Sequence, residues 1–391
     1  MTGAAIVGLG LTAMGKVYDR TGTSLAAEAV RAAVADAGLD LPDLDGLLVS
    51  SGVTQSAGIT LAGSLGLTDL ALLAQLNSFG ATAGVMVAQA AQAIAAGTAT
   101  TVACVFADNP LKPRSSAGAA YGTSRSVANT LRGIPGWSLA SGATNPNIFY
   151  ALCARRHMQQ FGTTSEQLAE VAVAQRAWAA GNPLAQMREP ITVADHQASR
   201  WIAEPLHLLD CCLVSNGAVA VVVTAADRAA DLARPPVHLW GYGQAHAPRD
   251  MRAGSQWGVV TPAARSGPAA LRMAGIGVDD VDVCELYDCY TYTVLVTLED
   301  YGFCAKGEGG EFVSGGRLAP GGDLACNTGG GQLSSYYMWG FTPLSEAVIQ
   351  ARGDGGARQA PRNDVVLVSG NGGILEHHST LVLSPHAKAA S

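Results

Sequence analysis

Charge is scarce in this sequence. Only 14% of its 391 residues are charged, whereas 48% are hydrophobic, and 24 Lys and Arg stand against 31 Asp and Glu, which gives a formal charge of −7. Such a chain can bury a large core, and its acidic balance excludes a nucleic-acid surface spread over the whole molecule. Any anionic ligand must therefore be bound by a local basic patch.

Residues 70–107 contain no charged side chain at all, and this stretch could be mistaken for a membrane span. Asparagine and glutamine side chains interrupt it, however, and Gly97 lies where a helix should end. We therefore predict no membrane span, but a buried strand, a buried helix and a second buried strand.

Patterns of cysteine and histidine are also missing. The eight cysteines include no CxxC pair, so they predict no disulfide framework and a cytoplasmic location. The N-terminus has no basic segment before its apolar residues and is interpreted as a strand, not as a signal peptide. His377 and His378 have no third ligand at a useful spacing, so they predict a polar turn before the last strand and no metal site.

A dinucleotide fingerprint is present only in part. Gly8-x-Gly10-x-x-Ala13 follows the first predicted strand, but the helix that this motif should open begins only near Ser24, because residues 16–22 are polar and typical of turns. A phosphate could not then lie at a helix N-terminus. We predict no NAD site and no separate cofactor.

Strands and helices alternate along the chain, which predicts an α/β fold with buried sheets. The first helix is expected to be capped by Ser24 and to end at Gly38. The second is apolar on all sides and should be buried on all sides. The predicted strands are 4–7, 47–50, 101–107, 219–224, 237–240, 281–286, 365–369 and 380–383, and the predicted helices are 25–37, 83–96 and 343–351.

Two segments of the chain resemble one another. Residues 37–47 (AGLDLPDLDGL) align without a gap on residues 274–284 (AGIGVDDVDVC), at an offset of 237. Each follows an alanine-rich helix and leads into a strand, so we predict a duplicated fold, although a chance match over eleven residues is the alternative. The expected halves are residues 1–235, with an insertion at about 110–205, and residues 236–391.

The insertion is basic. Between residues 110 and 200 nine Lys and Arg face four Asp and Glu, so this segment carries +5 and the rest of the chain carries −12. These cations either form the local patch for an anionic ligand or are scattered along solvated helices.

Three segments combine glycine with polar residues. They are residues 285–290 (ELYDCY), 327–337 (NTGGGQLSSYY) and 369–373 (SGNGG). Glycine clusters leave backbone N–H groups accessible for an oxyanion, and tyrosines beside them could exchange protons. Tight turns with amphipathic tyrosines are the alternative, and the residues alone favour that alternative.

With residues 205–218 (PLHLLDCCLVSNGA), these segments give the chain a resemblance to the thiolase superfamily, in its lipid-transfer-protein branch. The resemblance implies a duplicated fold of two similar halves in αβαβα layers, with a loop-domain insertion that binds coenzyme A. Thiolases use a nucleophilic cysteine, an Asn or His, a further His and a second cysteine. Alignment places Gly80, Tyr287, Tyr337 and Ser369 at these four positions.

Glycine cannot form the acyl-cysteine intermediate of Claisen chemistry, so this is not a working thiolase. The pattern resembles the steroid side-chain aldolases of the same branch, which cleave a β-hydroxyacyl-CoA to a ketone and a short acyl-CoA such as propionyl-CoA. A retro-aldol reaction needs a base, an oxyanion site and an acid, but no nucleophile. A degenerate thiolase that serves as a scaffold or binds acyl-CoA is the alternative.

The resemblance also implies the roles of single residues. Tyr287 and Tyr337 would be the acid and base, and Gly80 would clear room for a bulky ketone. Asp288 and the cysteines Cys289, Cys304 and Cys326 are expected to be structural. Ser369, Gly372 and Gly373 would complete the oxyanion and substrate pocket, and Arg125, Arg132, Arg155 and Arg156 would bind coenzyme A as part of the substrate.

Two protein partners follow from the resemblance. One is a second copy of the chain, paired across a two-fold axis through the strand at residues 101–107. The other is a small protein with an OB fold and a zinc ribbon.

Overall fold

The computed structural model describes residues 3–115, 140–247 and 256–388. Its main feature is a ten-stranded sheet in the order β10-β9-β11-β12-β8-β1-β7-β4-β2-β3. The N-terminal half supplies β1 (Ala4–Leu11), β2 (Gly46–Ser51), β3 (Leu72–Gln75), β4 (Thr101–Asp108) and β7 (Gly217–Ala225). The C-terminal half supplies β8 (Val237–His246), β9 (Val283–Glu285), β10 (Ala325–Cys326), β11 (Val366–Gly372) and β12 (His377–Ser384).

The two halves repeat one topology. In the N-terminal set β2 runs parallel to β3 and β4, while β7 runs antiparallel to β4 and β1. In the C-terminal set β9 runs parallel to β10 and β11, while β12 runs antiparallel to β11 and β8. The sets meet where Ala5 and Ile6 of β1 pair with His238 and Val237 of β8.

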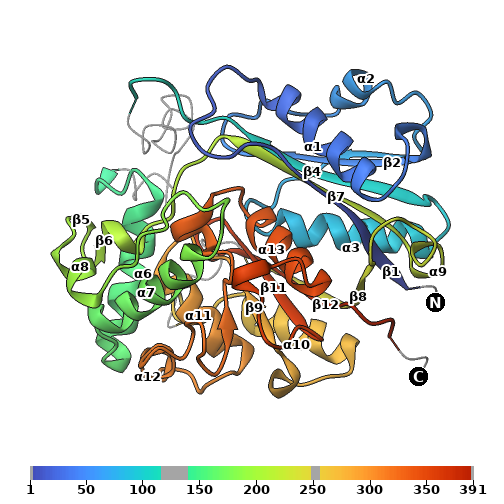
Figure 1. Cartoon of the computed structure of the whole chain (residues 1–391). Coiled ribbons are helices and arrows are strands. Elements are labelled where there is room, and N and C mark those ends of the chain that lie inside the picture. Colours follow the sequence, from blue (N-terminus) through green and yellow to red (C-terminus); the bar gives the residue numbers. More distant parts are fainter. Residues whose placement is uncertain (1–2, 116–139, 248–255, 389–391) are drawn as a thin grey trace.

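Helices complete five layers, as expected (Figure 1). Helices α3 (Thr82–Ala95) and α13 (Phe341–Arg352) lie between the two sets of strands, and both contact β7 from one set and β11 and β12 from the other. Helix α1 (Gly22–Asp36) covers the outer face of the N-terminal set. Helix α10 (Ala263–Ala274) covers β8 and β12, and α11 (Thr291–Tyr301) packs against α10.

The repeat is confirmed by local structure. The short 3₁₀ helices Leu41–Asp43 and Val278–Asp280 lie 237 residues apart, which is the offset of the sequence match. Gly38 and Gly275, which end the preceding helices, have left-handed φ angles of 71° and 79°. A chance match would not reproduce these elements, so the chain is a duplicated fold, and its division at residue 235 stays a prediction.

The Gly-x-Gly motif serves helix packing. A Cβ atom on Gly8 or Gly10 would lie 2.0 or 2.1 Å from carbonyl oxygens of α1. At the matching place in the second half, Gly241 and Gly243 of β8 would meet carbonyl oxygens of α10 at 2.3 and 2.2 Å. Glycine thus allows each helix to approach its strand closely.

Several predicted boundaries were wrong. The first helix is capped by Thr21, whose hydroxyl accepts the Ser24 N–H, and not by Ser24 itself. Strand β3 is an edge strand with alternating exposure, and Leu73 is 42% exposed, so it is not a buried strand. His377 and His378 belong to β12 and not to a turn, and β11 does not end at Ser369 but continues to Gly372, which pairs with His377.

The buried helix α3 largely meets its prediction. Its residues are buried or half-buried except for Gln92 and Ala95, which are exposed. Thr101–Asp108 of β4 is buried along its whole length, with Phe106 facing the central layer and Val105 facing the α1 layer. Among the described helices none is long and apolar enough to cross a membrane.

The insertion forms a helical unit beside the C-terminal half (Figure 1). Its helix α7 packs against α11. The elements of the insertion are α6 (Pro146–Phe161), α7 (Ser165–Ala180), α8 (Val193–Ala198), β5 (Trp201–Ala203), β6 (Leu206–His207) and the 3₁₀ helix Leu208–Asp210. Short elements elsewhere are α2 (Leu61–Leu65), α9 (Ala226–Ala229), α12 (Gly309–Val313), the π-turn Gly331–Ser335 and the 3₁₀ helix Gly356–Arg358.

Candidate active site

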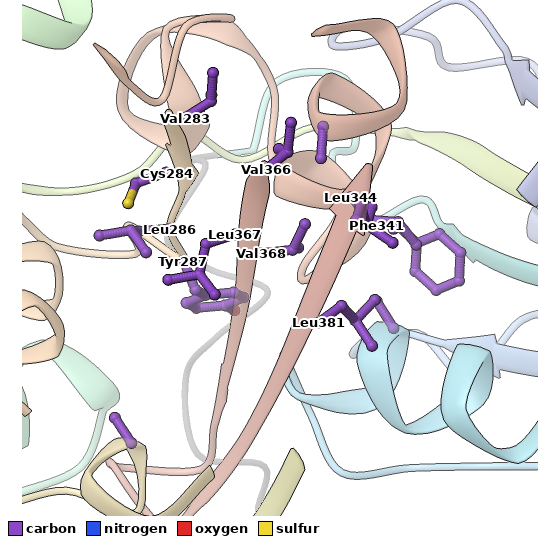
Figure 2. Close-up of a cluster of buried hydrophobic side chains, with 14 of the residues drawn as sticks. Val283, Cys284, Leu286, Tyr287, Phe341, Leu344, Val366, Leu367, Val368 and Leu381 are labelled. Carbon is purple, nitrogen blue, oxygen red and sulfur yellow. The ribbon is translucent and has the colours of Figure 1, made fainter. Parts of the chain in front are cut away.

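The side chains of Tyr287 and Tyr337, both in the C-terminal half, contact each other. Their hydroxyl oxygens lie 2.9 Å apart in a hydrogen bond, and their rings meet edge-on with centroids 6.4 Å apart. Tyr287 follows β9 and extends its apolar cluster (Figure 2), whereas Tyr337 follows the π-turn Gly331–Ser335 and is half-buried. Segments 50 residues apart thus deliver two phenols to one point, and their catalytic role stays a prediction.

Gly80 does not leave open space, which corrects the sequence prediction. A Cβ atom on Gly80 would lie 2.2 and 2.3 Å from ring carbons of Tyr287 and 2.2 Å from the carbonyl oxygen of Asn371. The ring of Tyr287 therefore fills the volume that was expected to admit a bulky ketone. A cysteine at position 80 and this tyrosine cannot coexist without displacement, so the missing nucleophile and the added phenol form one packing unit.

Symmetry between the halves brings the loops together. Phe79 and Trp339, which precede α3 and α13, both have left-handed φ angles, 51° and 49°, and their rings lie 6.0 Å apart. A Cβ atom on Gly340 would lie 2.3 Å from the carbonyl oxygen of Gly80. The turns before the two central helices thus lie against each other, and Tyr337 enters the site three residues before Gly340.

Ser369 holds the backbone of Tyr287. Its hydroxyl accepts the N–H of Tyr287 at 2.9 Å, and the serine is buried. Ser369 therefore positions the phenol through its main chain, and it does not form the wall of an open pocket as expected.

The backbone of Tyr337 is held by a serine of the segment 205–218. Ser215 accepts the N–H of Tyr337 at 3.0 Å and the side-chain amide N–H of Gln186 at 3.0 Å. No local pattern distinguishes Ser215 from other loop serines. Its role depends on the insertion and the C-terminal half lying side by side.

Asp288 anchors the loop that carries Tyr337. Its carboxylate accepts the N–H of Gln332 at 2.8 Å and that of Leu333 at 3.1 Å. Asp288 is fully buried, and burial raises its pKa to about 7. Asp288 is therefore structural, as expected, and contacts the π-turn instead of the phenols.

A small cavity lies beside the π-turn Gly331–Ser335, and neither Tyr287 nor Tyr337 lines it. Its walls are Glu285, Leu286, Asp288, Asn327, Gly329, Gly331, Ser335, Tyr336, Thr342, Pro343 and Glu346. Burial and the neighbouring carboxylate of Glu346 raise the pKa of Glu285.

The three cysteines that were expected to be structural pack as neutral thiols. Cys289 and Cys326 are buried and Cys304 is half-buried. Burial raises the pKa of Cys289 and of Cys304 to about 12, and raises that of Cys326 as well. Because the thiolate is the nucleophile, none of the three is prepared to form a covalent intermediate.

Residues 371–373, at the end of β11, form the glycine turn. A Cβ atom on Gly372 would lie 2.0 Å from the carbonyl oxygen of Ser78, and Gly373 has a left-handed φ of 65°. Both glycines are thus required by close approach or backbone conformation. Their use as N–H donors to an oxyanion stays a prediction.

The proposed coenzyme A arginines are only partly described. Arg125 and Arg132 lie outside the described residues. In α6, Arg155 forms an ion pair with Glu204 at 2.6 Å, and Arg156 donates to the carbonyl oxygen of Trp257 at 3.0 Å. Their contact with a ligand stays a prediction.

In the described part of the chain, no three His, Cys, Asp or Glu residues are grouped so that they could hold a metal ion.

Comparison with known families decides the identity of this fold. The thiolase N-terminal domain model matches residues 4–227, and the thiolase C-terminal domain-like model matches residues 243–385. The chain belongs to the thiolase family. The fold is similar to that of human mitochondrial 3-ketoacyl-CoA thiolase in complex with CoA, a structure that is 15% identical with a TM-score of 0.70, over 99% of this chain and 98% of the other.

Two similar proteins are named as an aldolase and a lyase. The steroid side-chain-cleaving aldolase of Thermomonospora curvata is 38% identical over 378 residues, 94% of this chain and 95% of that protein. The 17-hydroxy-3-oxo-4-pregnene-20-carboxyl-CoA lyase of Mycobacterium tuberculosis is also 38% identical, over 94% and 96% of the two chains. A solved Ltp2-ChsH2(DUF35) aldolase is 38% identical with a TM-score of 0.88, over 98% of both chains.

Proposed function

We propose that this thiolase-family protein is an aldolase. It cleaves a β-hydroxyacyl-CoA by a retro-aldol reaction, without a covalent nucleophile, into a ketone and a short acyl-CoA such as propionyl-CoA. The hydrogen bond of 2.9 Å between Tyr287 and Tyr337, at the point where Gly80 leaves no nucleophile, carries this proposal. Two relatives at 38% identity, named as an aldolase and a CoA lyase, support it.

The reaction transfers two protons and breaks one bond. Tyr337, the more exposed of the two, enters the reaction as the phenolate and Tyr287 as the protonated phenol. Tyr337 accepts the proton of the β-hydroxyl while the Cα–Cβ bond breaks, and the electron pair of that bond forms the thioester enolate. Tyr287 then donates a proton to Cα. The direct hydrogen bond between the phenols returns a proton from Tyr337 to Tyr287, so the pair is restored after each turnover.

The enolate oxygen needs hydrogen-bond donors. The backbone N–H groups of Gly372 and Gly373 are proposed for this role, with Ser369 behind Tyr287. Coenzyme A binds to the basic insertion, where Arg125, Arg132, Arg155 and Arg156 meet its phosphates. The acyl group is a steroid side chain with a tertiary hydroxyl, as the names of the relatives suggest.

A degenerate thiolase that only binds acyl-CoA is the second candidate. Loss of family residues by drift would not be expected to fill the nucleophile position with the ring of a hydrogen-bonded tyrosine. The fit between Gly80 and Tyr287 therefore favours catalysis.

Incubation with a β-hydroxyacyl-CoA that bears a tertiary hydroxyl tests the function, with release of the ketone and propionyl-CoA as the readout. Tyr287→Phe and Tyr337→Phe keep each ring and remove one hydroxyl, so each is expected to lower kcat by about 10²- to 10⁴-fold. Tyr242→Phe, in β8, is the matched control, because its hydroxyl contacts Gln92 and not the site. Retention of a third of wild-type kcat by both site variants would favour the scaffold.

Two assemblies are part of the proposal. The strand expected to pair across the two-fold axis, β4, already has β2 and β7 on its two sides, so the homodimer is assigned to the edge strand β3 instead. The named complex of the Ltp2-ChsH2(DUF35) aldolase supports a second, small partner, for which we propose an OB fold with a zinc ribbon. A cytoplasmic location is supported by the eight cysteines, all of which are thiols and not disulfides.

A further inference from the structure

A second hydrogen-bonded group lies at the glycine turn, and the reaction above does not use it. The hydroxyl of Tyr150, in α6, donates to the carbonyl oxygen of Gly373 at 2.9 Å. The side-chain amide of Asn371 donates to the same hydroxyl oxygen at 3.0 Å. Tyr150 is 3% exposed and Asn371 is 2% exposed, so both contacts are made out of water.

The direction of these two bonds is fixed by chemistry. A carbonyl oxygen can only accept, so the single proton of the Tyr150 hydroxyl is committed to Gly373. Tyr150 must then accept from Asn371, which orients the amide group of Asn371. The hydroxyl therefore holds both a main-chain and a side-chain group of β11 and the turn that follows it.

The ring of Tyr150 is itself held in place. It lies 4.5 Å from the ring of Tyr290, whose hydroxyl donates to the side chain of Asn147 at 2.5 Å. Tyr290 follows Tyr287 by three residues in the same segment. The first turn of α6 is thus attached both to the segment of Tyr287 and to the glycine turn.

The conformation of the glycine turn depends on contacts from residues outside it. Gly373 has a left-handed φ and no side chain of its own with which to fix the turn. The carbonyl oxygen of Asn371 and the ring of Tyr287 crowd the same point beside Gly80. A shift of residues 371–373 would therefore move both the proposed N–H donors and the packing of Tyr287.

We propose that Tyr150 is a positioning residue of the reaction, which fixes the glycine turn through Gly373 and Asn371 and joins it to the insertion. This inference rests on the proposed function of the site. Tyr150 does not itself exchange a proton with substrate, because its proton is committed to Gly373. In agreement, burial raises the pKa of Tyr150 well above its usual value.

Tyr150→Phe tests the proposal, because it keeps the ring and removes only the hydroxyl. A small misplacement of catalytic groups costs up to about 100-fold in rate, so we expect kcat to fall about 10- to 100-fold. The KM for acyl-CoA should change by less than about threefold, since uniform binding is not removed. The limbs of the pH profile of kcat should stay in place, because no titrating acid or base is lost.

Asn371→Ala supplies a second, independent variant. If the two side chains act as one unit, the double variant should be no slower than the slower single variant. Hydrogen exchange of the peptide covering residues 370–376 should become faster in Tyr150→Phe, and this readout needs no activity. Tyr242→Phe is again the control, with unchanged kcat and exchange.

The outcomes separate the two proposals. An inactive wild-type protein would overturn the proposed aldolase, and the exchange experiment would still test Tyr150. Unchanged kcat and unchanged exchange in a folded Tyr150→Phe protein would overturn the positioning role. A shifted limb of the pH profile would also overturn it, because Tyr150 would then be an acid or base in its own right.

Discussion

A single missing side chain determines how the site is built. Glycine is the only residue type at position 80 that leaves room for the ring of Tyr287. A Cβ atom there would lie 2.2 Å from a ring carbon of Tyr287 and 2.2 Å from the main-chain oxygen of Asn371. The backbone oxygen cannot move aside as a flexible side chain could. The proposed chemistry thus depends on position 80, which has no side chain, and on position 287, which carries a phenol.

Gly80→Ala is expected to move Tyr287 away from Tyr337 and to lower kcat by more than about tenfold, with a destabilisation of about 1–3 kcal/mol from overpacking. Gly63→Ala in α2 is the matched control, because nothing lies within 4 Å of its added Cβ atom. Steady-state kinetics and chemical unfolding measure both effects. Full activity in Gly80→Ala would show that Tyr287 does not need this position. Gly80→Cys should not restore thiolase activity.

Asp288 gives a prediction about pH. Burial raises its pKa to about 7, against about 3.9 in an unfolded chain. Between these values the folded protein holds the proton and the unfolded chain does not, so the unfolding free energy falls as pH rises from about 4 to about 7. Compared with Asp288→Asn, wild type should lose up to about 1.4 kcal/mol per pH unit in this window.

Chemical unfolding of both proteins at several pH values checks this difference. Groups such as Glu285, whose pKa is also raised, are present in both proteins, so most of their contribution cancels. Parallel stability curves would mean that Asp288 is ionised throughout. Asp288→Asn should also slow the reaction, because the carboxylate accepts the N–H groups of Gln332 and Leu333 and so fixes the π-turn that precedes Tyr337 in the chain.

At the scale of elements, the open edge of the sheet matters most. In the described part of the chain β3 pairs with β2 alone, and its residues alternate between half-buried and exposed. An exposed edge with apolar side chains is a template for strand pairing. The neighbouring Phe79 is 46% exposed, which extends the apolar surface beyond β3.

Leu73→Glu is therefore expected to convert a dimer of about 80 kDa into a monomer, because a charge would have to be buried at the two-fold axis. Met273→Glu is the control, since Met273 is equally exposed (48%) but lies at the end of α10. Light scattering distinguishes the two states. A stable, active monomer of the wild-type chain would refute the dimer.

The sequence predicted most elements but not all of their limits. Hydrophobic periodicity located the strands and the apolar helix α3, because both patterns arise from burial that the residues themselves record. It could not reveal that β11 continues through the glycine-rich segment, since pairing of Asn371 with His378 and Gly372 with His377 is a tertiary contact. It also could not tell an edge strand from a central one, as β3 and β4 show.

The candidate site shows the same limit. Alignment with the family found Tyr287, Tyr337 and Gly80, but the expected empty space at Gly80 depended on a ring 207 residues away. The contacts of Ser215, Asn371 and Tyr150 could not be predicted, because they form only after distant segments of the chain have packed together. Residue type predicts chemistry, whereas support of that chemistry depends on the fold.

At the scale of the whole molecule, duplication and insertion divide the work. The two halves meet through two residue pairs of β1 and β8 and through α3 and α13, which places the ends of both central helices at one site. The insertion adds the excess of positive charge that the acidic halves lack. The rest of the chain, with a charge of −12, would otherwise repel the phosphates of coenzyme A.

This distribution of charge predicts how binding responds to salt and to substitution. The KM for the acyl-CoA should rise with ionic strength while kcat changes little, because salt screens the attraction between exposed charges, with a screening length of about 10 Å at 0.1 M.

Replacing Arg125, Arg132, Arg155 or Arg156 singly with Ala should raise KM for at least one of them and leave kcat mostly intact. Arg155 is the most informative, because its ion pair with Glu204 must open or be shared before a phosphate can bind. Glu204→Ala should therefore lower KM, if Arg155 meets the ligand. An unchanged KM in all four arginine variants would place the nucleotide outside the insertion.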